Sequence, residues 1–384
     1  MFDCPHVVLL HAYSSKNSGD GLLVDLSTQL IRQAVGEAAR ISIVAADPAS
    51  FPDYPNVHPA PVLAEKGIGR IAGAASLLLP VDVNRRMRPL LELLRTADLV
   101  VGVGGGYLRA RNCIEALKLE AGHMLQMRAA CAAGKPTVYL PQSIGPVMPE
   151  EPLRSHLSNM LAKFSSVFVR DERSVQFLAH NRNTLRAPDL AVMDFERRGT
   201  DIMARAEKAG TRLSHVAFVL RRAPSWTAEQ RHRYETSTRR LIDLLRAHCR
   251  LSFAVQSTGR GNDDLAYYRS ININGELKSL KSTLTTDRPD AVVSVRLHGA
   301  LESLLSGVPA YHLSYERKGF GAYADLGLDD WVSNAADFDP EQVAAKVMKP
   351  DAICDFWQNA SSGFARIREG NHNVRTALQS ALGA

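Results

Sequence analysis

The stretch Leu99-Val100-Val101-Gly102-Val103-Gly104-Gly105-Gly106 decides the fold. Its first five residues are apolar or glycine and show no in-out alternation, so they predict a strand that helices cover on both faces of a parallel sheet. Three consecutive glycines follow, as expected where the backbone turns tightly or leaves room for a ligand. Both features are typical of an α/β domain.

Similar apolar runs recur on either side of this stretch and alternate with segments of helical periodicity. The expected strands of the first half are 7–11, 41–45, 99–103, 137–140 and 167–169, and its clearest helices are 22–35 and 114–133. The second half repeats the pattern with strands 216–220, 251–256, 291–295 and 309–313 and helices 228–249 and 297–306. We therefore predict two Rossmann-like, doubly wound domains whose strand ends face a cleft.

The boundary between the two predicted domains lies in the polar stretch 196–214, which shows no strand pattern. We assign residues 1–205 to an N-terminal domain and residues 206–384 to a C-terminal domain. Residues 355–384 are predicted to be helical, and we expect this segment to pack back across the junction.

Composition and charge narrow the classes of function. Of the 384 residues, 45% are hydrophobic and 22% charged, which predicts a folded globular protein. Lys and Arg total 46 against 40 Asp and Glu, and this net charge of +6 is spread along the chain. A mild, dispersed excess favours a small anionic ligand, or peripheral contact with a membrane surface, over a nucleic-acid partner.

Cysteine usage and hydropathy bear on the location of the protein. The five cysteines are scattered and form no CxxC pair, so they predict neither a disulfide framework nor a metal site: Cys4, Cys113, Cys131, Cys249 and Cys354. No apolar stretch reaches the roughly 20 residues of a membrane helix, and no basic leader precedes the first apolar run. We expect a cytoplasmic protein, with contact at the inner face of the membrane left open.

Loops after the strands of the first domain predict ligand contacts. The candidate residues are Asn17, Gly19, Asp20, Gly105, Gly106 and Gln142. The first three lie between a strand and a helix, where small residues let a ligand approach the helix N-terminus. Asp20 fits the N-cap of that helix equally well. The amide of Gln142, after the fourth strand, suits sugar hydroxyls.

The second domain carries the sharpest signal. One strand ends at Arg221-Arg222, and another ends at Arg296-Leu297-His298-Gly299 before a helix. Two guanidinium groups, an imidazole and a helix N-terminus on one sheet edge predict a pocket for a compact polyanion. Lys318 follows the next strand and could add a third cation.

The order of these motifs resembles that in polysaccharide pyruvyl transferases over about residues 7–330. The matching segments are Asn17-Ser18-Gly19-Asp20, Gly104-Gly105-Gly106, Gln142-Ser143-Ile144-Gly145-Pro146, Val169-Arg170-Asp171-Glu172-Arg173-Ser174, Pro188-Asp189, Arg296-Leu297-His298-Gly299, Gly307-Val308-Pro309 and Tyr315-Glu316-Arg317-Lys318.

This resemblance implies a GT-B-like fold and a transferase that moves the pyruvyl group of phosphoenolpyruvate onto a sugar of a surface polysaccharide or its precursor, forming a pyruvate ketal. It places the donor on Arg221, Arg296, Leu297 and His298. Lys318 is a weaker third cation for the donor, and we expect His298 to be the catalytic proton donor, because an imidazole both holds and releases a proton near neutral pH. Either of the paired arginines at 221 and 222 could point inward. We expect no cofactor and no metal, and we expect the saccharide acceptor to lie against the loops of the first domain. Asp20 and Glu316 are candidates for the general base.

Two other functions remain open. A GT-B glycosyltransferase or a sugar-nucleotide epimerase would share the fold, although the second domain shows no persuasive ribose-binding carboxylate. A non-catalytic protein of a polysaccharide-assembly system is the second alternative, and His298 beside Arg296 argues against it. A nucleic-acid role receives no support, because no aromatic-interleaved basic motif is present.

Overall fold

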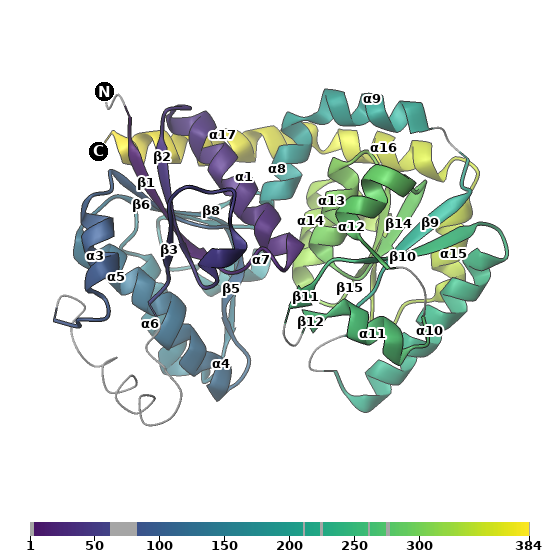
Figure 1. The fold of residues 1–384 in the computed structure, drawn as a ribbon, viewed down its shortest axis with the longest axis horizontal. Coiled ribbons are helices and arrows are strands. Elements are labelled where there is room, and N and C mark those ends of the chain that lie inside the picture. The colour runs from purple at the N-terminus through teal and green to yellow at the C-terminus, as the bar shows by residue number, and fades with distance from the viewer. Residues whose placement is uncertain are drawn as a thin grey trace. The chain divides into compact units, whose positions relative to one another are not determined.

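The computed structural model describes residues 4–61, 83–209, 212–222, 226–259, 262–273 and 277–383 of the protein. The chain forms two compact units: unit 1 comprises residues 1–15, 20–190 and 370–384, and unit 2 comprises residues 16–19 and 191–369. Each unit is built on its own parallel sheet (Figure 1). This confirms the prediction of two doubly wound α/β domains.

The sheet of unit 1 has eight parallel strands in the order β3-β2-β1-β4-β6-β7-β8, with β5 beside β6. The strands are β1 (His6–Ala12), β2 (Arg40–Ala45), β3 (Val57–Pro59), β4 (Leu99–Gly102), β5 (Gly105–Ala110), β6 (Thr137–Val147), β7 (Ser166–Val169) and β8 (Thr184–Arg186). The chain first extends the sheet on one side of β1 and then places β4 on its other side. The switch point of this sheet therefore lies between β1 and β4, where open α/β sheets bind ligands.

The helices of unit 1 follow the predicted pattern with one correction. They are α1 (Ser18–Val35), α3 (Arg88–Arg95), α4 (Cys113–Lys118), α5 (Leu125–Ala133), α6 (Glu150–Leu161) and α7 (Glu172–Phe177). The single helix expected over residues 114–133 is interrupted by a π-helical turn at Leu119–Met124. The spacing of apolar residues over the whole segment is compatible with one helix, so it does not predict the extra residue of a π-helical turn.

The sheet of unit 2 has six strands in the order β13-β10-β9-β14-β15-β16, all parallel. They are β9 (His215–Val219), β10 (Arg250–Val255), β13 (Lys278–Ser279), β14 (Ala291–Ser294), β15 (Ala310–Ser314) and β16 (Val332–Asn334). A separate two-stranded ribbon pairs β11 (Thr258–Gly259) with β12 (Asn262–Asp263). The switch point of the large sheet lies between β9 and β14.

Several helices of unit 2 begin at a capping side chain. The helices of this unit are α8 (Leu190–Arg197), α9 (Gly199–Ala209), α10 (Ala228–Arg246), α11 (Asp264–Ser270), α12 (Leu280–Ser282), α13 (Leu297–Leu305), α14 (Arg317–Asp325), α15 (Pro340–Met348), α16 (Ala352–Ser362) and α17 (Phe364–Leu382), the last of which continues into unit 1. A capping side chain begins α10, α11, α12 and α15. Thr227 and Gln230 form a reciprocal capping box at α10, and Asp339 caps α15 ahead of Pro340. Among the described residues, none of the helices combines the length and apolarity of a membrane span.

The division of the chain differs from the predicted boundary at residue 205. Residues 191–205 cluster with unit 2, because the ring of Phe195 on α8 contacts Phe364 at 5.1 Å and Arg205 on α9 donates to the carbonyl of Leu305 at 3.0 Å. Residues 370–384 cluster with unit 1, where Gln379 donates to the carbonyl of Ala34 at 3.0 Å. The first boundary therefore moves to residues 190/191.

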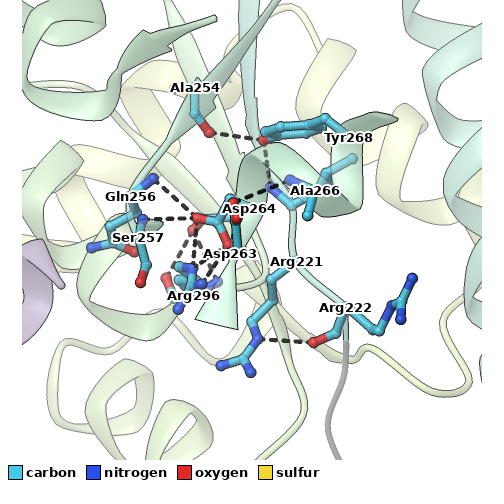
Figure 2. A network of polar contacts seen from close by, with 12 residues as sticks. Arg221, Arg222, Ala254, Gln256, Ser257, Asp263, Asp264, Ala266, Tyr268 and Arg296 are labelled. Carbon is cyan, nitrogen blue, oxygen red and sulfur yellow. Dashed lines mark hydrogen bonds and ion pairs between the residues drawn. The ribbon is translucent and has the colours of Figure 1, made fainter. Parts of the chain in front are cut away.

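A buried tyrosine joins three elements of unit 2. The hydroxyl of Tyr268 on α11 donates to the carbonyl of Ala254 on β10 at 2.8 Å (Figure 2). The same hydroxyl accepts from the backbone N–H of Leu220 at 2.9 Å. Its side chain is fully buried. The neighbouring Tyr267 is almost as buried, but its hydroxyl, which lies near Tyr234, has no hydrogen-bond partner of standard geometry among the described residues.

Tyr268→Phe should lower the free energy of unfolding by about 1–3 kcal/mol, because it removes the hydroxyl that hydrogen-bonds a buried N–H and a buried carbonyl. Tyr267→Phe is the matched control and should cost clearly less. Urea unfolding of both variants measures the difference, and equal losses would show that the hydroxyl of Tyr268 does not hold these elements together.

Candidate active site

The carboxyl edge of the unit 2 sheet gathers the charged residues that the sequence singles out. Arg221 follows β9, and Arg296 lies between β14 and α13, so the two arginines lie on either side of the switch point. Arg296 is the N-cap residue of α13, and no side chain caps this helix. A nine-residue helix with an uncapped N-terminus directed at this edge favours anion binding.

A buried ion pair fixes Arg296. Its Nε lies 3.0 Å and 3.2 Å from the two carboxylate oxygens of Asp264, and its Nη2 also contacts that carboxylate (Figure 2). Both side chains are almost completely buried. Asp264 also accepts from the backbone N–H groups of Gln256 and Ser257, at 3.1 Å and 2.9 Å. The pair therefore links the loop after β10 to the start of α13, and the carboxylate compensates the charge of the guanidinium.

The two adjacent arginines at the end of β9 have different environments. Arg221 is 9% exposed, whereas Arg222 is exposed, and their side chains point in different directions (Figure 2). Nη1 of Arg221 donates to the hydroxyl of Tyr315 at 2.8 Å, its Nε donates to the carbonyl of Arg222 at 3.1 Å, and its guanidinium lies 4.9 Å from the centre of the Tyr315 ring. Among the described residues, no carboxylate pairs with Arg221. Of the two arginines, Arg221 is the one buried at this edge.

His298 lies in the first turn of α13, next to Arg296 and Leu297, and is partly exposed. A methyl group on Gly19 would lie 3.0 Å from its Cβ and Nδ1 atoms, so a side chain at residue 19 would press against the imidazole. Gly299 is constrained in the same way, since a Cβ atom there would lie 2.8 Å from Oε1 of Gln256. Residues 16–19 therefore pack closely against His298, and Gln256, after β10, packs against the first turn of α13.

A second acid lies one helical turn beyond His298. Burial raises the pKa of Glu302 to about 7, while the charge of Lys281 and hydrogen bonding with Ser18 and Gln256 act in the opposite direction. Neither side-chain amide atom of Gln256 meets standard hydrogen-bond geometry with the described residues, although the residue is 5% exposed. The interior of this edge is thus polar, and Glu302 within it changes its charge near neutral pH.

Lys318 opens α14 at the end of the next strand. Its Nζ lies 2.9 Å from a carboxylate oxygen of Glu316, and both side chains are largely buried. The charges of Lys318 and His298 both act on the buried His312 of β15, which places these three groups at the same edge. The carboxylate of Glu316 is paired with Lys318. Its role as a general base stays a prediction.

The residues predicted to contact an acceptor divide between the two units. Asn17 and Gly19 belong to unit 2, where Asn17 forms a bridge with Ser257. Asp20 lies in unit 1, in the first turn of α1 rather than at its N-cap, because the helix already begins at Ser18. The remaining three belong to unit 1, where Gly105 and Gly106 start β5, and Gln142 of β6 is the register partner of Gly105.

Asp264, a partner of Arg296, and His312 were not predicted from the sequence. Asp264 follows Asp263 at the start of α11, where acidic residues commonly cap or begin a helix. This position gives no sign of a contact with the distant Arg296. From the sequence, Tyr315 stands out only as part of a motif. Its contact with Arg221 joins two segments 94 residues apart, which no local pattern reveals.

His312 gives this edge a pH dependence. Its pKa is lowered to about 4. Burial is the main cause, the charges of Lys318 and His298 act in the same direction, and the hydrogen bond of Nδ1 with the carbonyl of Ser294 at 2.9 Å opposes the shift. The unfolded chain binds a proton at this histidine below pH of about 6.5, whereas the folded chain does so only near pH 4. Stability is therefore lost as the pH falls through this window.

His312→Asn should remove roughly 3 kcal/mol of the stability lost between pH 7 and pH 4, since it removes the titrating group and keeps a donor near Nδ1. Urea unfolding across this pH range measures the slope for wild type, His312→Asn and the control His248→Asn, whose side chain is exposed. Equal slopes in all three proteins would contradict this assignment.

Solved structures with a similar fold act on or bind nucleotide sugars or nucleotides. Alr3699/HepE from Anabaena, in complex with UDP and glucose, has a TM-score of 0.55 at 12% identity and covers 98% of this chain and 100% of its own. MnaA from S. aureus, in complex with UDP, has a TM-score of 0.53 at 10% identity, with 98% and 97% covered. UDP-N-acetylglucosamine 2-epimerase from Rickettsia bellii has a TM-score of 0.53 at 11% identity, with 99% and 97% covered. These likenesses show a GT-B-like fold.

The sequence itself identifies the family. No curated protein sequence matches the chain. The family model of polysaccharide pyruvyl transferases matches residues 17–317, which include Arg221, Arg296, His298 and the glycine loop after β4. The chain therefore belongs to the polysaccharide pyruvyl transferase family.

Proposed function

We propose that the protein transfers the pyruvyl group of phosphoenolpyruvate to a saccharide of a surface polysaccharide or its precursor, forms a pyruvate ketal and releases phosphate. The observation that carries this proposal is the buried guanidinium of Arg221, which has no carboxylate partner among the described residues. A buried charge is costly unless it is paired. A phosphorylated carboxylic acid supplies the missing counter-charge.

The donor would bind at the switch point of unit 2. Arg221 would contact one anionic group of phosphoenolpyruvate, and the uncapped N-terminus of α13, beginning at Leu297, would bind another through its backbone N–H groups. Arg296 and Lys318 add positive charge, although each is already paired with a carboxylate. We therefore assign the largest share of donor affinity to Arg221.

His298 would supply the proton that starts the reaction. Protonation of the methylene carbon of phosphoenolpyruvate makes C2 electrophilic, and two acceptor hydroxyls then bond to C2 in turn as the C2–O bond to phosphate breaks. Of the two protons that the hydroxyls lose, one reloads His298 and one leaves with phosphate. Imidazole suits this role because it releases a proton near neutral pH, which a guanidinium does not.

The acceptor would contact residues of unit 1, namely Asp20, Gly105, Gly106 and Gln142, and Asn17 and Gly19 of unit 2 would support the loop beside His298. The reaction as written needs no cofactor or metal. Three statements stay predictions: that the protein is cytoplasmic, that its acceptor is lipid-linked, and that it contacts the inner face of the membrane.

Arg221→Ala should weaken phosphoenolpyruvate binding at least roughly tenfold, because it removes a charge-assisted contact from a buried site. Arg222→Ala is the matched control, since it removes the same charge from an exposed neighbour, and should change the affinity little. Isothermal titration calorimetry with phosphoenolpyruvate distinguishes the two. Equal effects would show that net charge, and not Arg221, holds the donor.

His298→Ala should lower the rate of ketal formation on the order of 10²–10⁴-fold while phosphoenolpyruvate still binds. Incubation with phosphoenolpyruvate and a panel of glycosides, followed by mass spectrometry of the glycosides and a phosphate assay, measures the rate. Full activity of this variant would end the assignment of His298. Nucleoside diphosphate release from a UDP-sugar, without phosphate release from phosphoenolpyruvate, would instead favour a glycosyltransferase.

A further inference from the structure

A buried chain of polar rings lies at the switch point of unit 1. Nε2 of His11, at the end of β1, lies 2.7 Å from the hydroxyl of Tyr139 on β6. Nδ1 of His11 lies 3.2 Å from Nδ1 of His123. The ring of His123 stacks on Tyr107 of β5 with centroids 4.6 Å apart. The function proposed above uses none of these four residues.

The backbone deviates from regular geometry at both histidines. His11 has φ of 71°, a left-handed conformation that is rare outside glycine, and the β1–β2 register shifts between Leu9 and Ala12. His123 lies in the π-helical turn Leu119–Met124. Left-handed residues, bulges and π-helical turns are all over-represented at functional sites. Here all three bring two imidazoles into contact.

The hydrogen bonds fix where the protons lie. Burial lowers the pKa of His11 well below its usual value, helped by the charge of His123, and burial lowers the pKa of His123 to about 4, so both rings are neutral at pH 7. The hydroxyl of Tyr139 has no other acceptor among the described residues, so it donates to Nε2 of His11. Nδ1 of His11 then carries its proton and donates to Nδ1 of His123. His123 therefore carries its own proton on Nε2.

The chain runs from the core towards the surface. Tyr139 is fully buried and His11 is 2% exposed, whereas His123 is partly exposed. Nε2 of His123 makes no hydrogen bond to the residues that the structure describes. This atom is the outer end of the chain and presents a neutral N–H donor.

A second observation points to a ligand at the same place. The side chain of Gln142 is fully buried, yet neither its amide oxygen nor its amide nitrogen has a hydrogen-bond partner of standard geometry among the described residues. Its amide lies near the hydroxyl of Tyr107, the ring on which His123 stacks. An amide and a neutral imidazole together offer the donors and acceptors that sugar hydroxyls need, without charge.

We propose that His123 and Gln142 form a saccharide-binding subsite in unit 1, in which Nε2 of His123 donates a hydrogen bond to one sugar hydroxyl and the amide of Gln142 binds a second. His11 and Tyr139 are positioning residues that fix the tautomer of His123. The identity of this saccharide as the pyruvyl acceptor rests on the proposed function, whereas binding of a saccharide does not.

Two conservative variants test the role of Nε2. His123→Asn keeps a polar atom near Nδ1 for His11 and removes the outward N–H, while His123→Gln keeps an amide near the position of Nε2. With any glycoside that is pyruvylated, we expect the acceptor KM to rise roughly tenfold in His123→Asn and less in His123→Gln. The kcat value and the phosphoenolpyruvate affinity should stay near wild type. His156→Asn is the control, because His156 binds Glu120 of the same π-helical turn and is exposed.

A binding experiment separates this inference from the proposed function. Methyl glycosides of glucose, galactose, mannose and N-acetylglucosamine are titrated, without phosphoenolpyruvate, into protein labelled with ¹⁵N-histidine. A glycoside that shifts the imidazole resonances of His123, and fails to bind His123→Asn, supports the subsite even if no pyruvyl transfer occurs. Absence of any shift with all four glycosides overturns it, as does a fall in kcat at unchanged acceptor KM. Tyr139→Phe should change the ¹⁵N shifts that report the tautomer of His123, and an unchanged spectrum would overturn the positioning role.

Discussion

The order of the parallel strands imposes one constraint on this protein. In each sheet the chain adds strands first on one side of a central strand and then on its other side. At the switch point the connecting helices leave on opposite faces, so the loops after the two central strands diverge and expose the carboxyl edge. Unit 1 has its switch point between β1 and β4, and unit 2 has its own between β9 and β14. This constraint explains the position of His11 at the carboxyl edge of the first sheet, and that of Arg221 and Arg296 at the carboxyl edge of the second.

The two arginines at the unit 2 switch point have different electrostatic environments. Arg296 is neutralised by Asp264, and this pair orders the loop after β10 and the start of α13. Arg221 keeps its charge and is held by a tyrosine hydroxyl and ring. Removing the aspartate would take this carboxylate away from a buried guanidinium, whereas binding an anion supplies a counter-charge to Arg221. Asp264 therefore gives Arg296 a structural role, and the proposed donor-binding role falls mainly to Arg221.

Local patterns predicted the long buried strands and the main helices, because apolar runs and helical periodicity are themselves local. They did not predict β3, β8 or β16, which are three residues long and too short for any periodicity. Motifs located Arg221, Arg296 and His298 on one edge, since strand ends in a parallel sheet share a side. The contacts of Asp264 and Tyr315 with these arginines depend on the tertiary structure, as does the meeting of His11 with His123, 112 residues away in sequence.

The wide turn between α4 and α5 has a consequence for how this protein tolerates change. A π-helical turn holds one residue more than the α-helix around it, so losing a single codon there would restore regular geometry. The segment on one side would then rotate by about 100° relative to the other. Leu125, Met127 and Ala130 are buried in α5 and anchor that side in the core, so the rotation would carry the imidazole of His123 away from its neighbour. Deletions in this stretch should therefore be selected against far more strongly than substitutions on its exposed face.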